Sequence, residues 1–598
     1  MTMQEKDKFT PELRILAASL LSMAVILLWA KFFGPKPPAN SPQSSKPGIS
    51  ASAPTAAEGG KPDVHSAAAP SGNVSGNAAP GSSSMAGAAP ATPVSAKSDT
   101  QERTVVIENE LYRVEISNRG AVVKSWQLKK YTDDNKPPRI LDVVHPLAAQ
   151  QIGGWPFAVV LDDPELQAAA NAGLYQMSPS SAEVVSPTDV DFSWSDGRLE
   201  VTKHFHFDGS YVAHVDVSVK HDGKPITAGV AWLGGFGDLT VANPANWDSV
   251  QTYYSEGGKI STYLPKKLDG LDKWGNGIWQ GGKDFAGLED RYFTAAFLPA
   301  NGAAPGTLET RYWKASEAME VAGQQTQVPV TEVATATSGP VTALRVFVGP
   351  KDYDDLKKMN PPLHGLVNFG WLEIIADPIF HGLKWLHTYI TNWGWAIVVL
   401  TLIINMLLFP LRISSYRTTL KMQRVGPEIK AIQDKFKKYG MRDPRKAEMN
   451  KEVMAVYSRE GINPVGGCVP MLLQMPLWFG LNTVLRYAIE MRHARWFGWI
   501  TDLSARDPYY VLPVMMGLSM YLVSKMTPMT STDPQQQMMM KIMPVTMAGI
   551  FMISPISSGL AVYILTSSVV GIGQQWYLNR AHPVAAVVPA KVTRGKKS

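Results

Sequence analysis

The chain contains very little cysteine, since Cys468 is the only one among its 598 residues. A single thiol excludes an internal disulfide framework and any cysteine-rich metal centre. Acidic residues are absent from the apolar runs that could span a membrane, and the sequence has no phosphate-binding Gly-Lys loop and no hydrolytic constellation. We therefore expect no catalytic residues, no metal ligands and no cofactor, and we do not expect an enzyme.

The first apolar run extends from Ile15 to Phe33, about 19 residues, which is the length that a membrane-spanning helix needs. A cleavable signal peptide is the competing interpretation. The run is long for a signal peptide, and no small-x-small cleavage site follows it. We therefore expect residues 1–34 to form a cytoplasmic N-terminus and an uncleaved anchor span.

Residues 35–104 are built mainly from Ala, Pro, Ser and Gly, a composition typical of a flexible linker. From residue 105 the chain alternates apolar and polar residues, which is the periodicity of β-strands. Residues 199–223 have the pattern of a hairpin with a turn at Asp208-Gly209, and residues 340–350 that of a last strand. We predict one large all-β domain over 105–350, with the architecture of a sandwich.

Two histidines of this domain, His204 and His206, are two residues apart and should share one face of a strand. They could bind a metal ion or act as acid and base. The sequence offers no third ligand and no carboxylate pair at an informative spacing. We favour the simpler interpretation that both are solvated surface residues.

Beyond the β-domain the chain becomes helical and apolar. Residues 351–392 mix Trp and aliphatic residues with His and Lys, which suits an amphipathic helix lying in the membrane interface. Five further spans are predicted, several of them short or interrupted by Pro or Gly, near 393–411, 466–485, 509–524, 542–555 and 559–577. Short spans are accommodated by local thinning of the bilayer or by packing. Together with the anchor they make six spans, five of them in a core at 393–580.

The position of the positive charge predicts the orientation. Residues 412–461 hold 13 Lys and Arg against 6 Asp and Glu, although the whole chain has a net charge of only +6. The positive-inside rule places this segment in the cytoplasm. Both termini are then cytoplasmic, including the basic tail 581–598, and the β-domain lies on the far side, which is the periplasm in a bacterium.

The same segment, 412–461, has the pattern of a helical hairpin. Apolar residues recur on one face of each helix, Gly440 suits the stop of the first helix, and Asp443 with Pro444 suits the start of the second; the two apolar stripes are Val425, Ile429, Ile432 and Phe436, then Met449, Val453 and Val456. The hairpin is either a solvated basic surface or a contact for ribosomal RNA or lipid headgroups.

Polar residues inside the apolar runs need a separate explanation. Asn405 lies one helical turn from Thr401, and Arg412 follows seven residues later, about 10 Å further along a helix and close to the same face. Gln474 and Asn482 are two turns apart in another span. Tyr563, Thr566 and Ser567 cluster at i, i+3 and i+4 in a third.

These polar stripes have two interpretations. Ser, Thr, Asn and Gln can hold helices together as interhelical hydrogen-bonding groups. Alternatively, three striped spans and a nearby Arg can line one shared, water-filled groove, and we favour this second interpretation.

Methionine is concentrated in the same region, with 19 of the 26 residues after position 360. Core filling explains Met515 and Met516. The methionines at 526, 529 and 538–540 lie in or near a predicted loop, where flexible and polarizable side chains suit many apolar partners.

Several motifs occur in one order along the chain: NWGWAIVVLTL from Asn392, FPLR from Phe409, INPVGGCVPMLLQMPLWFGL from Ile462, DLSARDPYYVLPVMMG from Asp502, TDPQQQMMMKIMP from Thr532 and PISSGL from Pro555. On these motifs the chain resembles the YidC family of membrane protein insertases of Gram-negative bacteria. The resemblance implies a polytopic α-helical membrane protein with a five-span core and a periplasmic β-supersandwich domain. That domain is expected to be related to sugar-binding folds and largely dispensable for insertion.

The resemblance also implies a function and partners. The family places newly made proteins into the inner membrane and acts as a chaperone, alone or with the Sec translocon, through a hydrophilic groove open to cytoplasm and lipid. Nascent membrane proteins, transiently bound ribosomes and lipid are the implied partners, with no specific nucleic acid sequence. The cytoplasmic hairpin is expected to be needed for activity.

One departure from the family pattern concerns the cation of the groove, which usually lies five residues before the Pro of the FPL-type motif. In this chain that position is Asn405. Our hypothesis is that Arg412 supplies the positive field instead, and the rival is that the groove works by hydration alone.

Two other classes of protein remain as alternatives. A channel or transporter would be expected to show paired repeats with broken helices at matching positions. A membrane-anchored periplasmic sugar enzyme would require a carboxylate or histidine site within 105–350.

Overall fold

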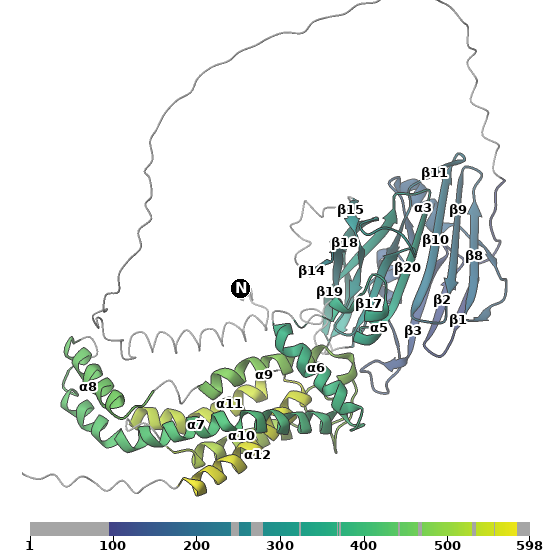
Figure 1. The fold of residues 1–598 in the computed structure, drawn as a ribbon. Helices are drawn as coiled ribbons and strands as arrows, with labels where there is room; N and C mark the ends of the chain where they lie inside the picture. Colours follow the sequence, from purple (N-terminus) through teal and green to yellow (C-terminus); the bar gives the residue numbers. More distant parts are fainter. Residues whose placement is uncertain are drawn as a thin grey trace, which may run out of the picture.

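The computed structural model describes residues 95–240, 250–264, 279–321, 324–367, 369, 372–439, 443–463, 469–528, 534–554 and 556–582. A β-rich domain precedes a bundle of long helices, and the domain stands at one end of the bundle (Figure 1). The predicted anchor span at 1–34, most of the linker and most of the basic tail lie outside the described residues.

The β-rich domain opens with a five-stranded sheet in the order β4-β3-β2-β1-β7. Its strands are β1 (Thr104–Glu108), β2 (Tyr112–Ser117), β3 (Val122–Thr132), β4 (Ile140–Asp142) and β7 (Glu183–Val185). Alternate residues of β1, such as Val105 and Ile107, are fully buried. This is the period-2 pattern that predicted strands here.

The largest sheet has the order β14-β13-β16-β17-β20-β10-β9-β8-β6, with β11 paired to β10. Its strands are β6 (Gln176–Ser178), β8 (Thr188–Ser195), β9 (Leu199–Phe207), β10 (Val212–His221), β11 (Lys224–Ile226), β13 (Gln251–Glu256), β14 (Lys259–Tyr263), β16 (Phe285–Glu289), β17 (Phe293–Pro299) and β20 (Val341–Pro350). The predicted hairpin is confirmed as β9 paired antiparallel with β10. The predicted last strand is β20, which lies in the middle of the sheet because it pairs with both β17 and β10.

A third sheet has the order β15-β18-β19-β12-β5. Its strands are β5 (Ala158–Val160), β12 (Gly229–Trp232), β15 (Gln280–Lys283), β18 (Leu308–Val321) and β19 (Gln324–Thr337). Two short helices, α2 (Pro146–Ile152) and α3 (Pro164–Ala172), interrupt the strands, so the domain is β-rich and not strictly all-β.

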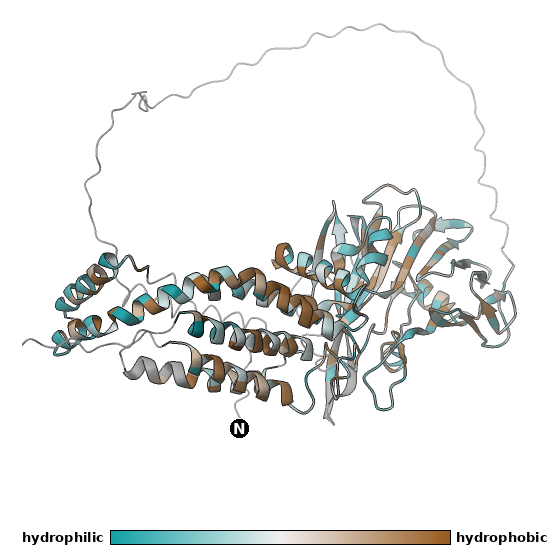
Figure 2. Ribbon diagram, turned by 60° about the horizontal axis from the view of Figure 1, so that its bottom comes forward, coloured by the Kyte–Doolittle hydropathy of each residue, from teal (hydrophilic) through white to brown (hydrophobic). Residues whose placement is uncertain are grey.

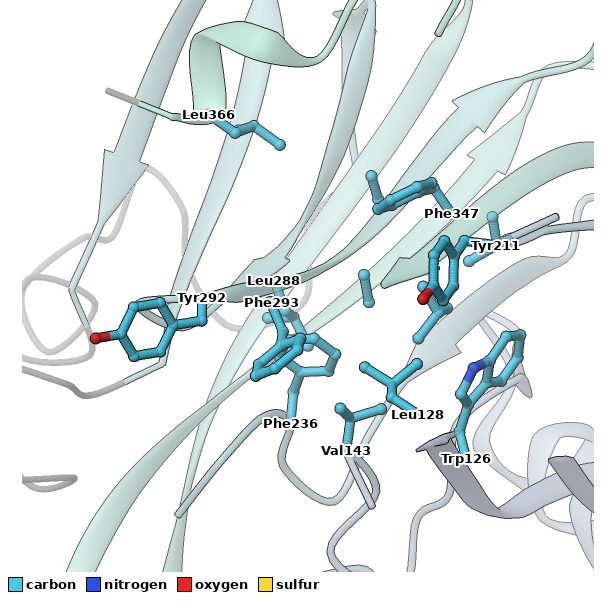
Figure 3. Close-up of a cluster of buried hydrophobic side chains, with 14 of the residues drawn as sticks. Trp126, Leu128, Val143, Tyr211, Phe236, Leu288, Tyr292, Phe293, Phe347 and Leu366 are labelled. Carbon is cyan, nitrogen blue, oxygen red and sulfur yellow. The ribbon is translucent and has the colours of Figure 1, made fainter. Parts of the chain in front are cut away.

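Large aromatic side chains fill the core of the β-rich domain (Figure 3). Trp126 stacks on Phe157 with ring centroids 6.2 Å apart, and Trp232 packs against both rings. One charged residue is buried with them: the Lys203 ammonium donates to the carbonyl oxygens of Gly120, Ala121 and Phe157 at 2.7, 3.0 and 2.8 Å. Burial lowers the pKa of Lys203 to about 7.

The helical part follows a short connection made of α5 (Tyr353–Lys358) and the 3-10 turn η2 (His364–Leu366). Its elements are α6 (Glu373–His387), α7 (Trp393–Lys435), α8 (Arg445–Arg459), α9 (Val469–Tyr487), the 3-10 turn η5 (Ile489–Met491), α10 (Val511–Met526), α11 (Pro534–Ile553) and α12 (Ser558–Ala581). Helices α7, α9, α10, α11 and α12 overlap the five predicted core spans. By length and composition, α7 is the one described helix able to cross a membrane, while α10 and part of α11 are shorter apolar helices. The count of six spans stays a prediction.

Helix α7 differs from the prediction at its middle. We expected a span to end near residue 411 and a separate hairpin to begin at 412, but α7 runs unbroken for 43 residues, about 65 Å, through Pro410 and Pro427. The hairpin is therefore the second half of α7 together with α8. Its predicted apolar contact is confirmed, because Val425 and Ile429 pack against Val456. Gly440 lies outside the described residues.

The hairpin and the β-rich domain lie at opposite ends of the helical bundle (Figure 1). The hairpin end is largely hydrophilic, whereas the middle stretches of the bundle helices are apolar (Figure 2). Helix α6 lies where the bundle meets the β-rich domain, with Ile374 and Trp385 exposed on its surface.

The methionine prediction is half right. Met516 is fully buried in the bundle, as core filling requires, but Met515 is 45% exposed. Consecutive residues of a helix point about 100° apart, so the two side chains cannot share the packed face of α10. Met538 is also exposed, whereas Met529 and the side chains of 539 and 540 lie outside the described parts.

Candidate functional site

Asn405 lies in a polar contact between α7 and α12. Its amide nitrogen donates to the Thr401 carbonyl oxygen at 2.8 Å, and its amide oxygen accepts from the Ser567 hydroxyl at 3.3 Å. Thr401 and Asn405 are 1% and 8% exposed. The predicted polar stripe on α7 therefore faces α12. The side-chain amide of Asn405, which would be costly to bury without partners, is hydrogen-bonded to its own helix and to α12.

Arg412 joins the same contact through a residue that the sequence analysis did not select. The Arg412 guanidinium donates to the side-chain oxygen of Gln574 at 2.8 Å, and the Gln574 amide donates to the Asn405 carbonyl oxygen at 3.2 Å. Gln574 follows Ser567 by seven residues, as Arg412 follows Asn405. Extending the α12 stripe by two helical turns would have found it. Asn405 contacts Ser567, and seven residues later on both helices Arg412 contacts Gln574. Helices α7 and α12 therefore run in the same direction.

A glycine gives the guanidinium its place on α12. A Cβ atom at Gly571 would lie 3.2 and 3.3 Å from the two terminal nitrogens of Arg412. The bare backbone at this position therefore leaves room for the guanidinium close to the helix.

Helix α9 completes the contact. The Gln474 amide donates to the Ser567 hydroxyl at 3.3 Å and also lies beside the hydroxyl of Tyr563, which is 3% exposed. Thr566 and Asn482 are half-exposed and form no side-chain hydrogen bond within the described part of the chain. We define the polar network as Thr401, Asn405, Arg412, Gln474, Tyr563, Ser567 and Gln574; it unites six of the eight predicted residues with one that was missed.

The polar network carries a positive charge and contains no acidic residue. No carboxylate among the described residues pairs with Arg412, whose hydrogen-bond partner is a neutral amide. Arg412, Gln474 and Ser567 are half-exposed. The network therefore presents a single uncompensated cation beside neutral donors and acceptors, which suits the attraction of anionic or polar groups.

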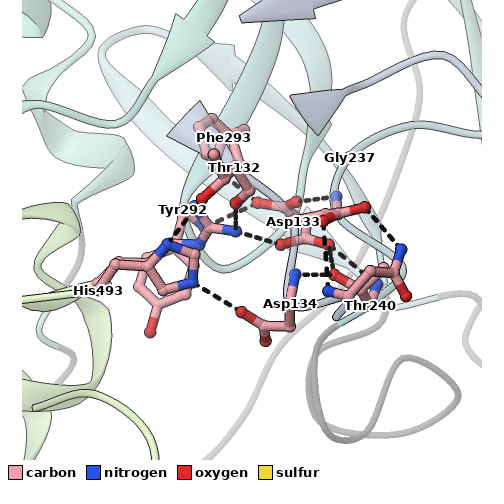
Figure 4. Close-up of polar contacts among 12 residues, drawn as sticks. Thr132, Asp133, Asp134, Gly237, Thr240, Tyr292, Phe293 and His493 are labelled. Carbon is pink, nitrogen blue, oxygen red and sulfur yellow. Dashed lines mark hydrogen bonds and ion pairs between the residues drawn. The ribbon is translucent and has the colours of Figure 1, made fainter. Parts of the chain in front are cut away.

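A second group of polar contacts, which no sequence pattern predicted, joins the β-rich domain to the segment between α9 and α10 (Figure 4). The Arg492 guanidinium donates to the Asp238 carboxylate at 2.5 Å and to the Thr132 carbonyl oxygen at 2.6 Å. The side chains of Arg492 and Asp238 are 3% and 1% exposed. The arginine also lies over the ring of Phe293, 5.4 Å from its centroid.

His493 extends this junction. One ring nitrogen lies 2.7 Å from the Asp134 carboxylate and the other 3.3 Å from the Thr132 hydroxyl (Figure 4). Burial acts to raise the pKa of Asp134, but the hydrogen bond from His493 and the charge of Arg492 outweigh it and lower that pKa. The backbone of His493 is left-handed, with φ of 54°, a conformation that non-glycine residues seldom adopt.

The two histidines considered in the sequence, His204 and His206, lie on the solvent-facing side of β9, as expected. Their imidazoles pair with the carboxylates of Asp191 and Asp189 on β8, each at 2.7 Å. Spacing along the chain does not reveal these two carboxylates as partners, because the pairing of β8 with β9 brings them beside the histidines. All four side chains are more than 40% exposed, which describes a solvated surface cluster.

The fold and the polar network are those of a helical membrane protein that has a polar contact inside its bundle, a β-rich domain at one end and a basic hairpin at the other. The 60Kd inner membrane protein family matches residues 385–585, and the YidC periplasmic domain family matches residues 104–382. This chain belongs to the YidC family, a family of bacterial inner membrane insertases that are not enzymes.

Two curated relatives are both described as membrane protein insertase YidC. The protein of Syntrophus aciditrophicus is 31% identical over 95% of this chain and 99% of its own length. That of Citrifermentans bemidjiense is 32% identical over 80% of this chain and 86% of its own length. A crystal structure of an active YidC insertase with its first transmembrane domain resolved is similar at 18% identity and a TM-score of 0.35, covering 82% of this chain and 96% of that one.

Proposed function

We propose that this protein inserts newly made proteins into the bacterial inner membrane, and that the polar network of α7, α9 and α12 lines the path of the client. The observation that carries this proposal is Arg412, whose guanidinium donates to the neutral amide of Gln574 and pairs with no carboxylate in the described part of the chain. A charged residue at such a place is costly, and residues of this kind usually mark a pathway or a binding site.

The mechanism follows from desolvation. The translocated tail of a client is polar and cannot enter hydrocarbon without partners. The hydroxyl and amide groups of Asn405, Ser567 and Gln474 offer such partners when they exchange their mutual hydrogen bonds for bonds to the client or to water. The apolar segment of the client then leaves sideways into lipid, driven by burial of its apolar surface.

Arg412 takes the role of the groove cation in this proposal. Asn405 occupies the position where the family usually has a positive charge, and it carries none. Arg412 approaches the same place because Gln574 contacts both residues. Its field would draw the acidic or polar tail of a client towards α12.

The topology is part of the proposal. We infer six spans, cytoplasmic termini, and a periplasmic β-domain over 105–350 preceded by a linker at 35–104. The opposite placement of the basic hairpin and the β-rich domain along the bundle supports this orientation (Figure 1). A cytoplasmic hairpin is available to the ribosome and to lipid headgroups. We also propose that the protein cooperates with the Sec translocon and acts as a chaperone.

Photo-crosslinking from position 405 tests the path. A photoreactive residue there, in membranes carrying a ribosome-bound nascent client, should crosslink to the client's first apolar segment. Leu407 is the matched control because it is on the same helix but 78% exposed, so a probe there should crosslink mainly to lipid.

The contrary outcome is also informative. Crosslinks from 405 only to lipid or to α12, while the same client inserts normally, would show that the polar network merely holds helices together. The groove proposal for α7 would then be wrong, although the chain would still be a member of the insertase family.

A further inference from the structure

The junction between the β-rich domain and the helical bundle brings three metal-ligating side chains together. One ligand atom each of Asp134, His493 and Asp502 lie within 4.8 Å of one another. Asp134 lies just beyond strand β3 of the β-rich domain, whereas His493 and Asp502 belong to the segment between α9 and α10. The group therefore spans two parts of the chain that are 359 residues apart.

Each of these side chains or its neighbourhood supplies a contact that fixes its position, and an ion would replace the hydrogen bond between His493 and Asp134. His493 has one ring nitrogen directed at Asp134 and the other beside the Thr132 hydroxyl (Figure 4). A hydrogen bond at the far nitrogen fixes the ring orientation of metal-binding histidines. One oxygen of Asp502 accepts from the backbone nitrogen and the hydroxyl of Ser504 at 2.7 and 2.8 Å, which leaves its other oxygen free of these contacts.

Asp134 is anchored from its backbone. Its backbone amide nitrogen donates to the Thr240 hydroxyl at 2.8 Å, which fixes the position of the backbone. Its carboxylate contacts His493. The three side chains consequently need only small movements to close on an ion, because the ligands of a tetrahedral zinc site at about 2.0–2.1 Å lie roughly 3.4 Å apart.

The local charge suits a divalent cation. The neighbouring Arg492 forms a buried pair with Asp238, although its charge and that of Arg291 still act on Asp134. Asp502 forms no ion pair in the described part of the chain, so the carboxylates of Asp134 and Asp502 supply negative charge that a dication would balance. One imidazole and two carboxylates form a nitrogen and oxygen set that suits Zn²⁺, with water at an open position.

We propose that Asp134, His493 and Asp502 bind one divalent transition-metal ion of the zinc class, and that this ion clamps the β-rich domain to the bundle. The clamp adds a non-covalent link to the single chain connection between the two parts. It does not depend on the insertion mechanism proposed above.

Zinc binding to the full-length protein tests this proposal. The protein, in detergent micelles and stripped of metal with EDTA, is titrated with Zn²⁺ against a chromophoric chelator, and bound zinc is counted after desalting. The wild type should bind one tight Zn²⁺. Affinity should fall roughly tenfold or more in each of Asp134→Asn, His493→Gln and Asp502→Asn.

The exposed histidine cluster of β9 provides the matched control. His204→Gln/His206→Gln removes two imidazoles from the same domain and should leave the tight site intact. Loss of tight binding in this control, with retention in the junction variants, would overturn the proposal and place the ion on the sheet. Absence of tight binding in the wild type would overturn it as well.

Hydrogen exchange tests the clamp itself. Zn²⁺ should slow exchange in peptides covering 130–136 and 490–505 of the wild type but not of His493→Gln. Unchanged exchange in a wild type that binds zinc through these three residues would refute the clamping role. Asp502→Asn should fold normally, because its amide oxygen can still accept the hydrogen bonds from Ser504. A loss of zinc binding in this variant would therefore not be explained by misfolding.

Discussion

Arg492 at the junction and Arg412 in the helical bundle both lie at contacts between elements, but the partners of their guanidinium groups differ in charge. Arg492, at the junction, meets the Asp238 carboxylate, a carbonyl oxygen and an aromatic face. Arg412, inside the bundle, meets one neutral amide. The buried Arg492 is paired with a carboxylate and acts as a structural joint, whereas the half-exposed Arg412 pairs with no carboxylate among the described residues and is available to a client. The difference separates the part that holds the molecule together from the part that acts on clients.

The largest effect should come from breaking the paired arginine. Asp238→Ala leaves Arg492 buried without a counter-charge and should destabilise the junction by about 3–5 kcal/mol. Thermal unfolding of the full-length protein, together with proteolytic release of the β-rich domain, measures this loss. Asp222→Ala removes an exposed carboxylate paired with Arg198 and should change neither. Equal behaviour of the two variants would contradict the structural role of Arg492.

Lys203 is a buried lysine of the β-rich domain, and its protonation should make the stability of the protein depend on pH. Its pKa is about 7 in the folded state against 10.5 in its ordinary state. Between pH 7 and 10 the unfolded chain therefore holds a proton that the folded chain has released. The free energy of unfolding should rise with pH in this window, by about 1.4 kcal/mol per unit from this group. As the pH is lowered, this gain should shrink steadily and be gone at about pH 7.

The Lys203→Met variant isolates this contribution. Its unfolding should lack the extra slope between pH 7 and 10, whereas Lys224→Met, at an exposed position on β11, should keep it. Identical slopes in the wild type and in Lys203→Met, measured by denaturant unfolding at several pH values, would show that Lys203 keeps its proton in the fold.

Removing the unpaired arginine should cost activity more than stability. Arg412→Ala should slow insertion of a client with an acidic translocated tail by roughly tenfold, equivalent to losing one charge-assisted hydrogen bond of about 1.5 kcal/mol. Arg412→Lys keeps the charge and should retain much of the rate. In vitro insertion into proteoliposomes, with a client whose tail is neutral as the comparison, measures both variants. Full activity of Arg412→Ala with every client would favour hydration alone.

The smallest effect is expected at Ser567. Ser567→Ala removes its hydroxyl contacts with Asn405 and Gln474. Interhelical hydrogen bonds in membrane proteins contribute about 0.6 kcal/mol on average, so thermal unfolding should shift only slightly. Val569, also on α12 but 55% exposed, provides the control through Val569→Ala. A large loss of insertion in Ser567→Ala without loss of stability would instead assign the hydroxyl to the client path.

Much of the local structure could be predicted from the sequence. The β9–β10 hairpin, strand β20 and the apolar contact of the basic hairpin follow from period-2 and period-3.6 patterns, which report which side of an element is buried. The uninterrupted course of α7 through Pro410 could not be predicted in this way. Proline usually marks a helix boundary, and packing and neighbouring groups decide when a helix tolerates it.

Most of the polar network could be predicted from the sequence. The stripe of Thr401, Asn405 and Arg412 follows from helical geometry alone, because residues four and seven apart share a face. The role of Gln574 was missed, although its spacing from Ser567 repeats that of Arg412 from Asn405. Spacing within one helix cannot say which neighbouring helix it faces, or whether the two run in the same direction.

The sequence by itself determined the family, the succession of strands and helices, and the polar face of α7, since these depend on ordered motifs and on periodicities along the chain. Only the tertiary structure decided which charges meet. Asp238 neutralises Arg492, Asp189 pairs with His206, and Asp134 meets His493, in each case across contacts made by distant segments. Packing brings such residues together, and no spacing along the chain encodes a distance between elements that are folded against one another.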